Sequence, residues 1–119
     1  MAAALSGFLA VGLGAFGAHA LKSHLAPDML AIYQTAVQYH FHHALALLAC
    51  GVLMRLGLDN VFLRASGILF MVGLMMFCGS LYLLAITGER WLGAVAPIGG
   101  LSFIGGWLML ALAIFRESS

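Results

Sequence analysis

The sequence predicts an all-α integral membrane bundle of four transmembrane helices, on the strength of its composition, its length and the placement of its charges. Of the 119 residues, 64% are hydrophobic and 8% are charged, whereas charged residues make up about a quarter of a soluble domain. A helix needs about 20 apolar residues to cross roughly 30 Å of hydrocarbon, so the chain has room for about four spans joined by short loops. We expect a single transmembrane domain over residues 1–119.

The first predicted span covers residues 3–21. Gly14 and Ala18 continue a stripe of small residues that begins at Ala10, and such stripes allow helix backbones to approach closely in lipid. Although Ala18-His19-Ala20 resembles a signal-peptidase site, no positively charged segment precedes the apolar run. We therefore expect a retained span with one face packed on another helix. Lys22 is expected to mark the membrane interface.

The second predicted span covers residues 39–56 and is preceded by further helix. Pro27 and Asp28 suit a first helical turn, and a helix from Pro27 to Leu56 would be roughly 45 Å long at 1.5 Å per residue. That exceeds the hydrocarbon thickness. We expect the turns before residue 39 to lie in the headgroup region or to project beyond the bilayer.

The third and fourth predicted spans cover residues 63–86 and 91–115. Small residues recur along both, and Pro97 predicts a kink in the fourth span because it removes one backbone hydrogen bond. The residues expected to pack helix against helix are Gly14, Ala18, Gly73, Ser80, Gly99 and Gly106.

Polar side chains concentrate at the start of the second span. At 100° per residue, Gln34, Gln38 and His42 share a narrow sector of the helix, and we expect this stripe to face the bundle interior. His40 points almost the opposite way and is expected to face lipid headgroups, as is His24. The full candidate polar binding cluster is His19, Gln34, Gln38, Tyr39, His42 and His43.

Two interpretations of this cluster remain open. Ionisable residues inside membranes are often functional, so the cluster could serve a metal, haem, quinone or proton. Alternatively, His19, Gln38, Tyr39 and His42 hydrogen-bond to one another across helices and fix the packing. We favour the structural interpretation because the cluster lies near a span end, and we expect no metal and no cofactor.

Other chemistries find little support in the sequence. All four acidic residues lie in loops or tails, so no span offers a carboxylate for proton coupling; these residues are Asp28, Asp59, Glu89 and Glu117. Cys50 and Cys78 lack a paired spacing. With a net charge of +1, the chain lacks the concentration of basic residues that would attract nucleic acid. We expect no enzymatic activity.

Several motifs together resemble one family. They are Gly14-Ala15-Phe16-Gly17-Ala18-His19-Ala20-Leu21, Tyr33-Gln34-Thr35-Ala36-Val37-Gln38-Tyr39-His40-Phe41-His42-His43, Gly79-Ser80-Leu81-Tyr82, and Trp91-Leu92-Gly93-Ala94-Val95-Ala96-Pro97-Ile98-Gly99-Gly100. Over nearly its whole length the chain resembles the domain-of-unknown-function family numbered 423, small bacterial inner-membrane proteins with eukaryotic relatives. The resemblance implies a four-span protein of the plasma membrane without an assigned activity. The resemblance also implies that Gly14, Gly17, His19, Gln34, Gln38, His42 and His43 match positions of the family pattern.

The favoured function is therefore that of a non-enzymatic inner-membrane protein that packs with itself or with a larger membrane protein. Such packing would affect membrane integrity or a membrane complex. The alternative is binding or transport of a small solute, lipid, metal or proton by the histidine cluster. Three arginines, Arg55, Arg64 and Arg116, face Lys22 and Arg90 across the membrane, which favours cytoplasmic termini.

Overall fold

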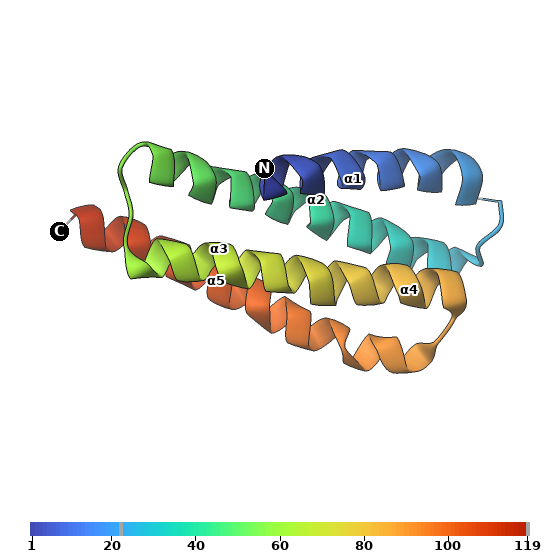
Figure 1. Ribbon diagram of the computed structural model, residues 1–119. Helices are drawn as coiled ribbons and strands as arrows, with labels where there is room; N and C mark the ends of the chain where they lie inside the picture. The colour runs from blue at the N-terminus through green and yellow to red at the C-terminus, as the bar shows by residue number, and fades with distance from the viewer. Residues whose placement is uncertain (22, 119) are drawn as a thin grey trace.

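The computed structural model describes residues 1–21 and 23–118 as long helices lying side by side (Figure 1). The elements are α1 (Ala2–Phe16), η1 (Gly17–Leu21), α2 (Pro27–Arg55), α3 (Val61–Gly73), η2 (Leu74–Cys78), α4 (Gly79–Thr87), η3 (Arg90–Ala94) and α5 (Ala96–Ser118). The bundle measures 52 × 26 × 17 Å. Lys22, expected at the interface, lies outside the described residues.

The prediction of an all-α membrane bundle is confirmed. Three stretches are long and apolar enough to cross a membrane, namely Ala2–Leu21, Val61–Thr87 and Arg90–Glu117. The elements form four helical rods: α1 with η1, then α2, then α3 with η2 and α4, and finally η3 with α5. The third rod is continuous, because the π-helical turn η2 joins α3 to α4 without a break. The remaining rod is α2, whose 29 residues lie alongside the others even though glutamines and histidines make it more polar.

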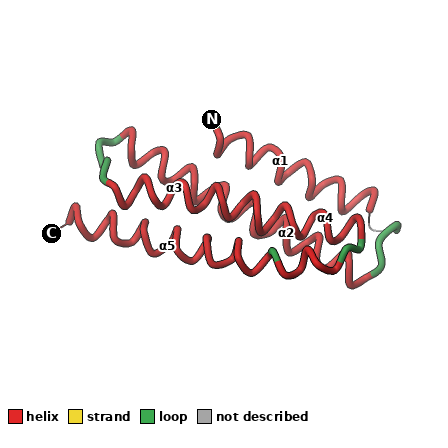
Figure 2. The backbone as a smooth tube through the Cα atoms, turned by 60° about the horizontal axis from the view of Figure 1, so that its bottom comes forward, coloured by secondary structure: helices red, strands yellow, loops and turns green. Residues whose placement is uncertain are grey.

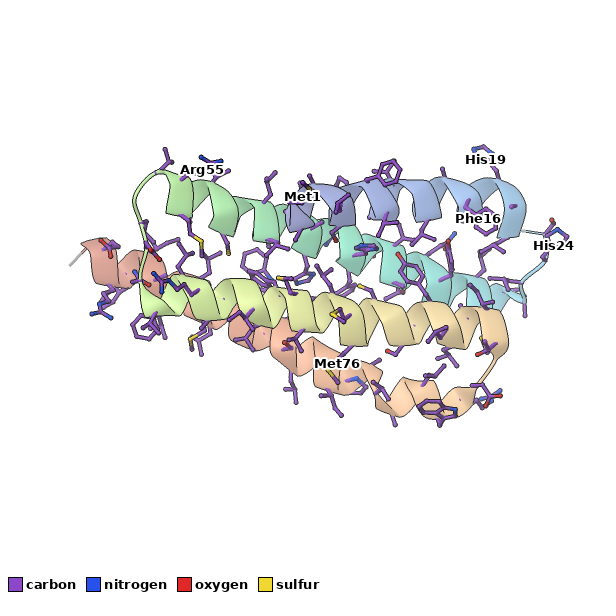
Figure 3. All side chains as sticks on the ribbon, viewed as in Figure 1. Met1, Phe16, His19, His24, Arg55 and Met76 are labelled. Atoms are coloured by element: carbon purple, nitrogen blue, oxygen red, sulfur yellow. The ribbon has the colours of Figure 1, made fainter. Side chains whose placement is uncertain are left out.

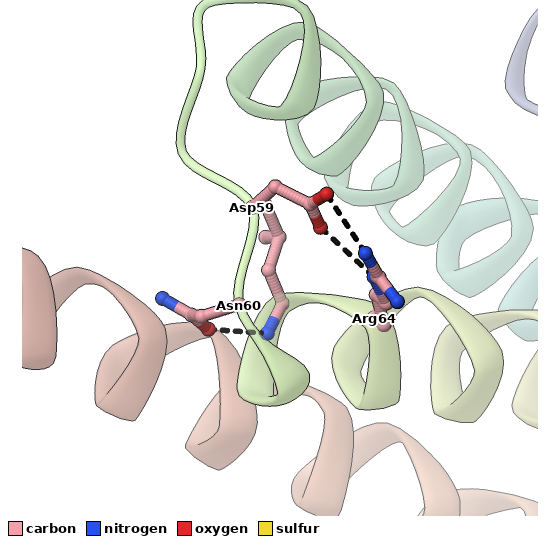
Figure 4. Close-up of polar contacts among 4 residues, drawn as sticks. Asp59, Asn60 and Arg64 are labelled. Atoms are coloured by element: carbon pink, nitrogen blue, oxygen red, sulfur yellow. Dashed lines mark hydrogen bonds and ion pairs between the residues drawn. The ribbon is translucent and has the colours of Figure 1, made fainter.

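Local sequence explains where the helices begin and end. Pro27 stands in the first turn of α2, where its missing N–H is not needed. The Asn60 side chain accepts a hydrogen bond from the Leu63 N–H at 3.0 Å and so caps α3 (Figure 4). Gly88 ends α4 with φ of 76°, a left-handed conformation that glycine adopts at little cost.

Small residues bring α5 against the third rod. A Cβ on Gly99 would lie 2.4 Å from the Phe77 backbone nitrogen, and Cβ atoms on Gly73 and Gly106 would overlap the rings of Phe103 and Phe70. Ser80 is also buried. The first helix packs elsewhere, since Figure 2 shows α1 and α5 on opposite sides of the bundle. α1 packs mainly along α2, where Gly14 lies against Val37. Ala18, also expected to pack against a helix, is exposed.

One local expectation is confirmed and one is revised. As expected, the segment before residue 39 is part of one continuous helix, and from Tyr33 onward it packs within the bundle, because Tyr33 and Ala36 are almost fully buried. Pro97 does not kink a helix interior. It falls in the first turn of α5, directly after the 3₁₀ turn η3, where no intrahelical hydrogen bond is lost.

Candidate functional site

The buried polar residues of α2 lie on the side of the helix that includes His40 and His43. His40 is only 8% exposed. Its Nδ1 lies 3.0 Å from the Tyr82 hydroxyl on α4, and its Nε2 lies 3.0 Å from the Ser6 hydroxyl on α1. In a neutral imidazole one nitrogen donates and the other accepts, and either hydroxyl can complement it. His40 therefore joins three helices through one ring. The expectation that it faces headgroups is wrong.

His43 makes a second junction, on the side that faces α5. Its Nδ1 donates to the Tyr39 carbonyl at 2.8 Å, and its Nε2 accepts from the Trp107 indole N–H at 3.0 Å. A carbonyl only accepts and an indole N–H only donates, so these partners assign a neutral ring with its proton on Nδ1. The ring also stacks on Phe103, with centroids 3.6 Å apart. His40 and His43 thus tie the buried side of α2 to α1, α4 and α5.

Tyr33 completes the buried set near the other end of α2. Its hydroxyl donates to the Leu13 carbonyl at 2.6 Å, and its ring lies where a Cβ on Gly17 would be, 2.4 Å from the Tyr33 Cε1 atom. The Tyr33 and Tyr82 rings meet edge to face at 5.3 Å. A side chain at residue 17 would therefore displace the tyrosine that anchors α1.

The structure does not bring the predicted cluster together. His19, Gln34, Gln38 and His42 are all exposed, and no hydrogen bond links these four residues within the described ranges 1–21 and 23–118. His19 points away from the bundle at the end where His24 also lies (Figure 3). The expectation that Gln34, Gln38 and His42 face the bundle interior is wrong. Of the predicted residues, His43 is buried and Tyr39 is half-exposed against Phe77.

The interior face was missed because the sequence offered two polar stripes on one helix. Tyr33, Ala36, His40, His43 and Cys50 recur at spacings of three, four or seven residues, as an inward face does. The stripe of Gln34, Gln38 and His42 has the same helical period, so periodicity alone does not show which of the two stripes faces the interior. The partners Ser6, Tyr82 and Trp107 lie 34, 42 and 64 residues away from their histidines, beyond the reach of any local pattern.

His40 and His43 are arranged to hold neighbouring helices together. Across the part of the chain that the structure describes, no three His, Cys, Asp or Glu side chains converge as a metal site would need, and no buried side-chain polar atom lacks a hydrogen-bond partner. Cys50 lies 3.6 Å from Ser66, whose hydroxyl donates to the Gly106 carbonyl at 2.7 Å. The interior polar groups therefore connect helices to one another.

Comparison with known proteins places this arrangement in a family. The family model described as "Protein of unknown function (DUF423)" matches residues 13–100. The chain belongs to this family. Relatives of the family carry the name UPF0382 membrane protein: SH2409 of Staphylococcus haemolyticus is 43% identical over 113 residues, 95% of this chain and 91% of its own length. YwdK of Bacillus subtilis is 42% identical over 115 residues, 95% and 92% of the two chains.

As a UPF0382 protein, the chain is a multi-pass membrane protein. These two relatives each match 95% of the chain. The matched residues 13–100 include Tyr33, His40, His43 and Tyr82 and leave out Ser6 and Trp107. No solved structure matches this UPF0382 protein.

Proposed function

We propose that the protein is a non-enzymatic membrane protein that acts by packing against a second copy or a larger membrane protein. The observation that carries this proposal is the outward polar stripe of α2, formed by Gln34, Gln38 and His42. All three side chains are exposed, and none has a hydrogen-bond partner among the described residues.

The position of the stripe along α2 suits contact with another protein. At 1.5 Å per residue, Gln38 lies about 25 Å along α2 from Arg55, so with Arg55 at one interface it falls near the other side of a hydrocarbon layer roughly 30 Å thick. Amide and imidazole side chains at helix contacts in membranes hydrogen-bond across to neighbouring helices. A partner covering the stripe would replace lipid by hydrogen-bonding groups.

The surroundings of the stripe suit another helix. Beside Gln34 and Gln38 runs a shallow groove of about 240 Å³ between α1 and α2, lined also by Gly14, Gly17 and Ala18. Small residues let a second helix approach, and amide side chains hydrogen-bond across such contacts. The wider role, support of membrane integrity or of a membrane complex, rests on this packing.

Disulfide cross-linking in native membranes tests the proposal. In a Cys50→Ala/Cys78→Ala background, Gln38→Cys should form a discrete cross-linked dimer under oxidation, whereas Leu83→Cys on the exposed side of α4 should not. For a larger partner, a photo-cross-linker at residue 38 should instead give one heterologous product. A protein that stays monomeric and partner-free in both experiments would refute the proposal.

Association should also respond to the amide itself. Gln38→Leu should weaken self-association about three- to twentyfold, because interhelical hydrogen bonds in membranes contribute roughly 0.6–1.7 kcal/mol each. Energy transfer between labelled copies in vesicles measures this change. Leu45→Ala, on the same outward face, is the matched control and should have a smaller effect.

A further inference from the structure

The geometry points to a binding site for one anionic phospholipid in a groove at the end of the bundle opposite His19. This groove is distinct from the α2 stripe, and the inference goes beyond the proposed function. It has a volume of about 720 Å³, within the range of about 300–1,000 Å³ common for small-molecule sites. Its walls are the C-terminal half of α2, residues 64–71 of α3 and the first residues of α1.

The floor of the groove is apolar and open. Leu48, Gly51, Ile68 and Met71 line it, and Leu48, Ile68 and Met71 are 44–62% exposed. Gly51 contributes only backbone, and a Cβ added there would meet nothing within 4 Å. A hydrocarbon chain can therefore lie along α2 at this point without displacing any side chain.

The outer end of the same groove is cationic. Arg55 and Arg64 both line it. Arg55 stands at the end of α2 (Figure 3) and forms no ion pair within the described ranges. Arg64 donates from Nε and Nη2 to the two carboxylate oxygens of Asp59, at 2.9 and 2.8 Å (Figure 4). This pair fixes the guanidinium, and among the described residues its Nη1 group has no hydrogen-bond partner.

The order of these surfaces identifies the occupant. Moving inward from the loop between α2 and α3, the groove changes from two guanidinium groups to hydrocarbon side chains over about two helical turns. A phospholipid has the complementary order, with phosphate oxygens at the headgroup and acyl chains beneath. Arginine binds phosphate through several N–H donors at once. Because two arginines outnumber the one carboxylate of Asp59, a headgroup with net negative charge should be preferred over a zwitterionic one.

Native mass spectrometry of the full chain in mild detergent tests this site. Phosphatidylglycerol and phosphatidylcholine with identical acyl chains are the probes, added at equal concentration. The wild type should retain phosphatidylglycerol several-fold more than phosphatidylcholine. Arg55→Gln should reduce that retention about tenfold, as expected for the loss of one charge-assisted hydrogen bond. Arg90→Gln, the same charge change at the other end of the bundle, should leave it unchanged.

A second pair of variants tests the groove rather than the charge. Gly51→Leu should fill the floor and lower phosphatidylglycerol retention, while the melting temperature stays the same or rises because leucine favours a helix more than glycine does. Gly12→Leu makes the same change on α1, where a Cβ also meets nothing within 4 Å, and should not affect retention.

Clear outcomes would overturn the inference. Equal retention of the two lipids would mean that the groove does not distinguish an anionic headgroup from a zwitterionic one. Equal losses from Arg55→Gln and Arg90→Gln would reduce the effect to overall charge. Equal behaviour of Gly51→Leu and Gly12→Leu would place the lipid elsewhere, and dimers that Gly51→Leu dissociates would make a second copy the occupant. Cross-linking at residue 38 reports on the other face and can fail or succeed independently.

Discussion

His43 shows how a single side chain contributes to membrane packing. Both ring nitrogens have partners on the protein, and one ring face lies on Phe103. Hydrocarbon supplies no hydrogen-bond partners, so a buried imidazole must find both of them within the bundle. The same requirement explains His40 between Ser6 and Tyr82. Each histidine specifies which helices are neighbours.

The bond from Trp107 to His43 can be tested by removing only its donor. Trp107→Phe should destabilise the protein by about 0.6–1.7 kcal/mol, because the ring remains but His43 Nε2 loses its partner. SDS-driven unfolding in mixed micelles measures the change. Trp91→Phe, at a residue that is 65% exposed, is the control, and equal effects of the two substitutions would argue against this role.

The ion pair between Asp59 and Arg64 gives a pH dependence of known sign. The hydrogen bonds from Arg64 hold the pKa of Asp59 below its usual value, so the paired carboxylate stabilises the folded state above the unfolded pKa of about 3.9. That contribution is lost as the pH falls through the lower, folded pKa. Because the pair is exposed, the effect should be small.

Asp59→Asn should therefore lower the melting temperature slightly and by a constant amount between about pH 5 and pH 8. Below about pH 4 the difference from wild type should shrink. Thermal melts in detergent across this range measure it, with Glu89→Gln at the opposite end as the control. A difference that grows on acidification would contradict the assignment.

At the scale of the helices, the contact between α5 and the third rod depends on glycine. Gly99 meets backbone atoms of Phe77 within the π-helical turn η2, and backbone cannot move aside as a side-chain end can. Gly73 and Gly106 instead face aromatic rings. At Gly99, therefore, α5 approaches the backbone of its neighbour and not only a side chain.

Gly99→Ala should consequently destabilise the protein by about 1–3 kcal/mol or more, the usual cost of overpacking. Gly79→Ala, five residues past the start of η2, has open space around its new Cβ and should be neutral or stabilising, because alanine favours a helix by about 1 kcal/mol over glycine. Unfolding in mixed micelles compares them. Similar losses from both substitutions would mean that the close approach does not govern stability.

At the scale of the whole molecule, charge separates the two ends of the bundle. The loop between α2 and α3 and the C-terminus lie at one end (Figure 1), which brings Arg55, Arg64 and Arg116 together there. Arg90 lies at the other end, on the turn after α4. Cytoplasmic ends carry the excess of arginine and lysine, so we propose that the Arg55 end faces the cytoplasm.

Reporter fusions test this orientation. A C-terminal green fluorescent protein should fluoresce, and a C-terminal alkaline phosphatase should be inactive, because the first folds in the cytoplasm and the second requires export. Arg55→Gln combined with Arg64→Gln should weaken the preference and produce mixed topology. An active phosphatase on the wild-type chain would reverse the assignment.

The sequence by itself determined the class of protein and the course of the chain. Apolar composition and the confinement of acids such as Asp59 and Glu89 to turns predict helices that cross a membrane, because unpaired charge and backbone are costly in hydrocarbon. The close-packing role of Gly73, Gly99 and Gly106 was also predictable, since small residues are what lipid-embedded interfaces require.

Only the tertiary structure decided which face of α2 is the interior. Gln38 and His42 on one side and His40 and His43 on the other share the same helical period, so local pattern treats them alike. The choice depends on Ser6, Tyr82 and Trp107, which distant helices bring within hydrogen-bond distance. An imidazole in hydrocarbon is stable where partners reach both of its nitrogens, and the position of those partners is a property of the assembled bundle.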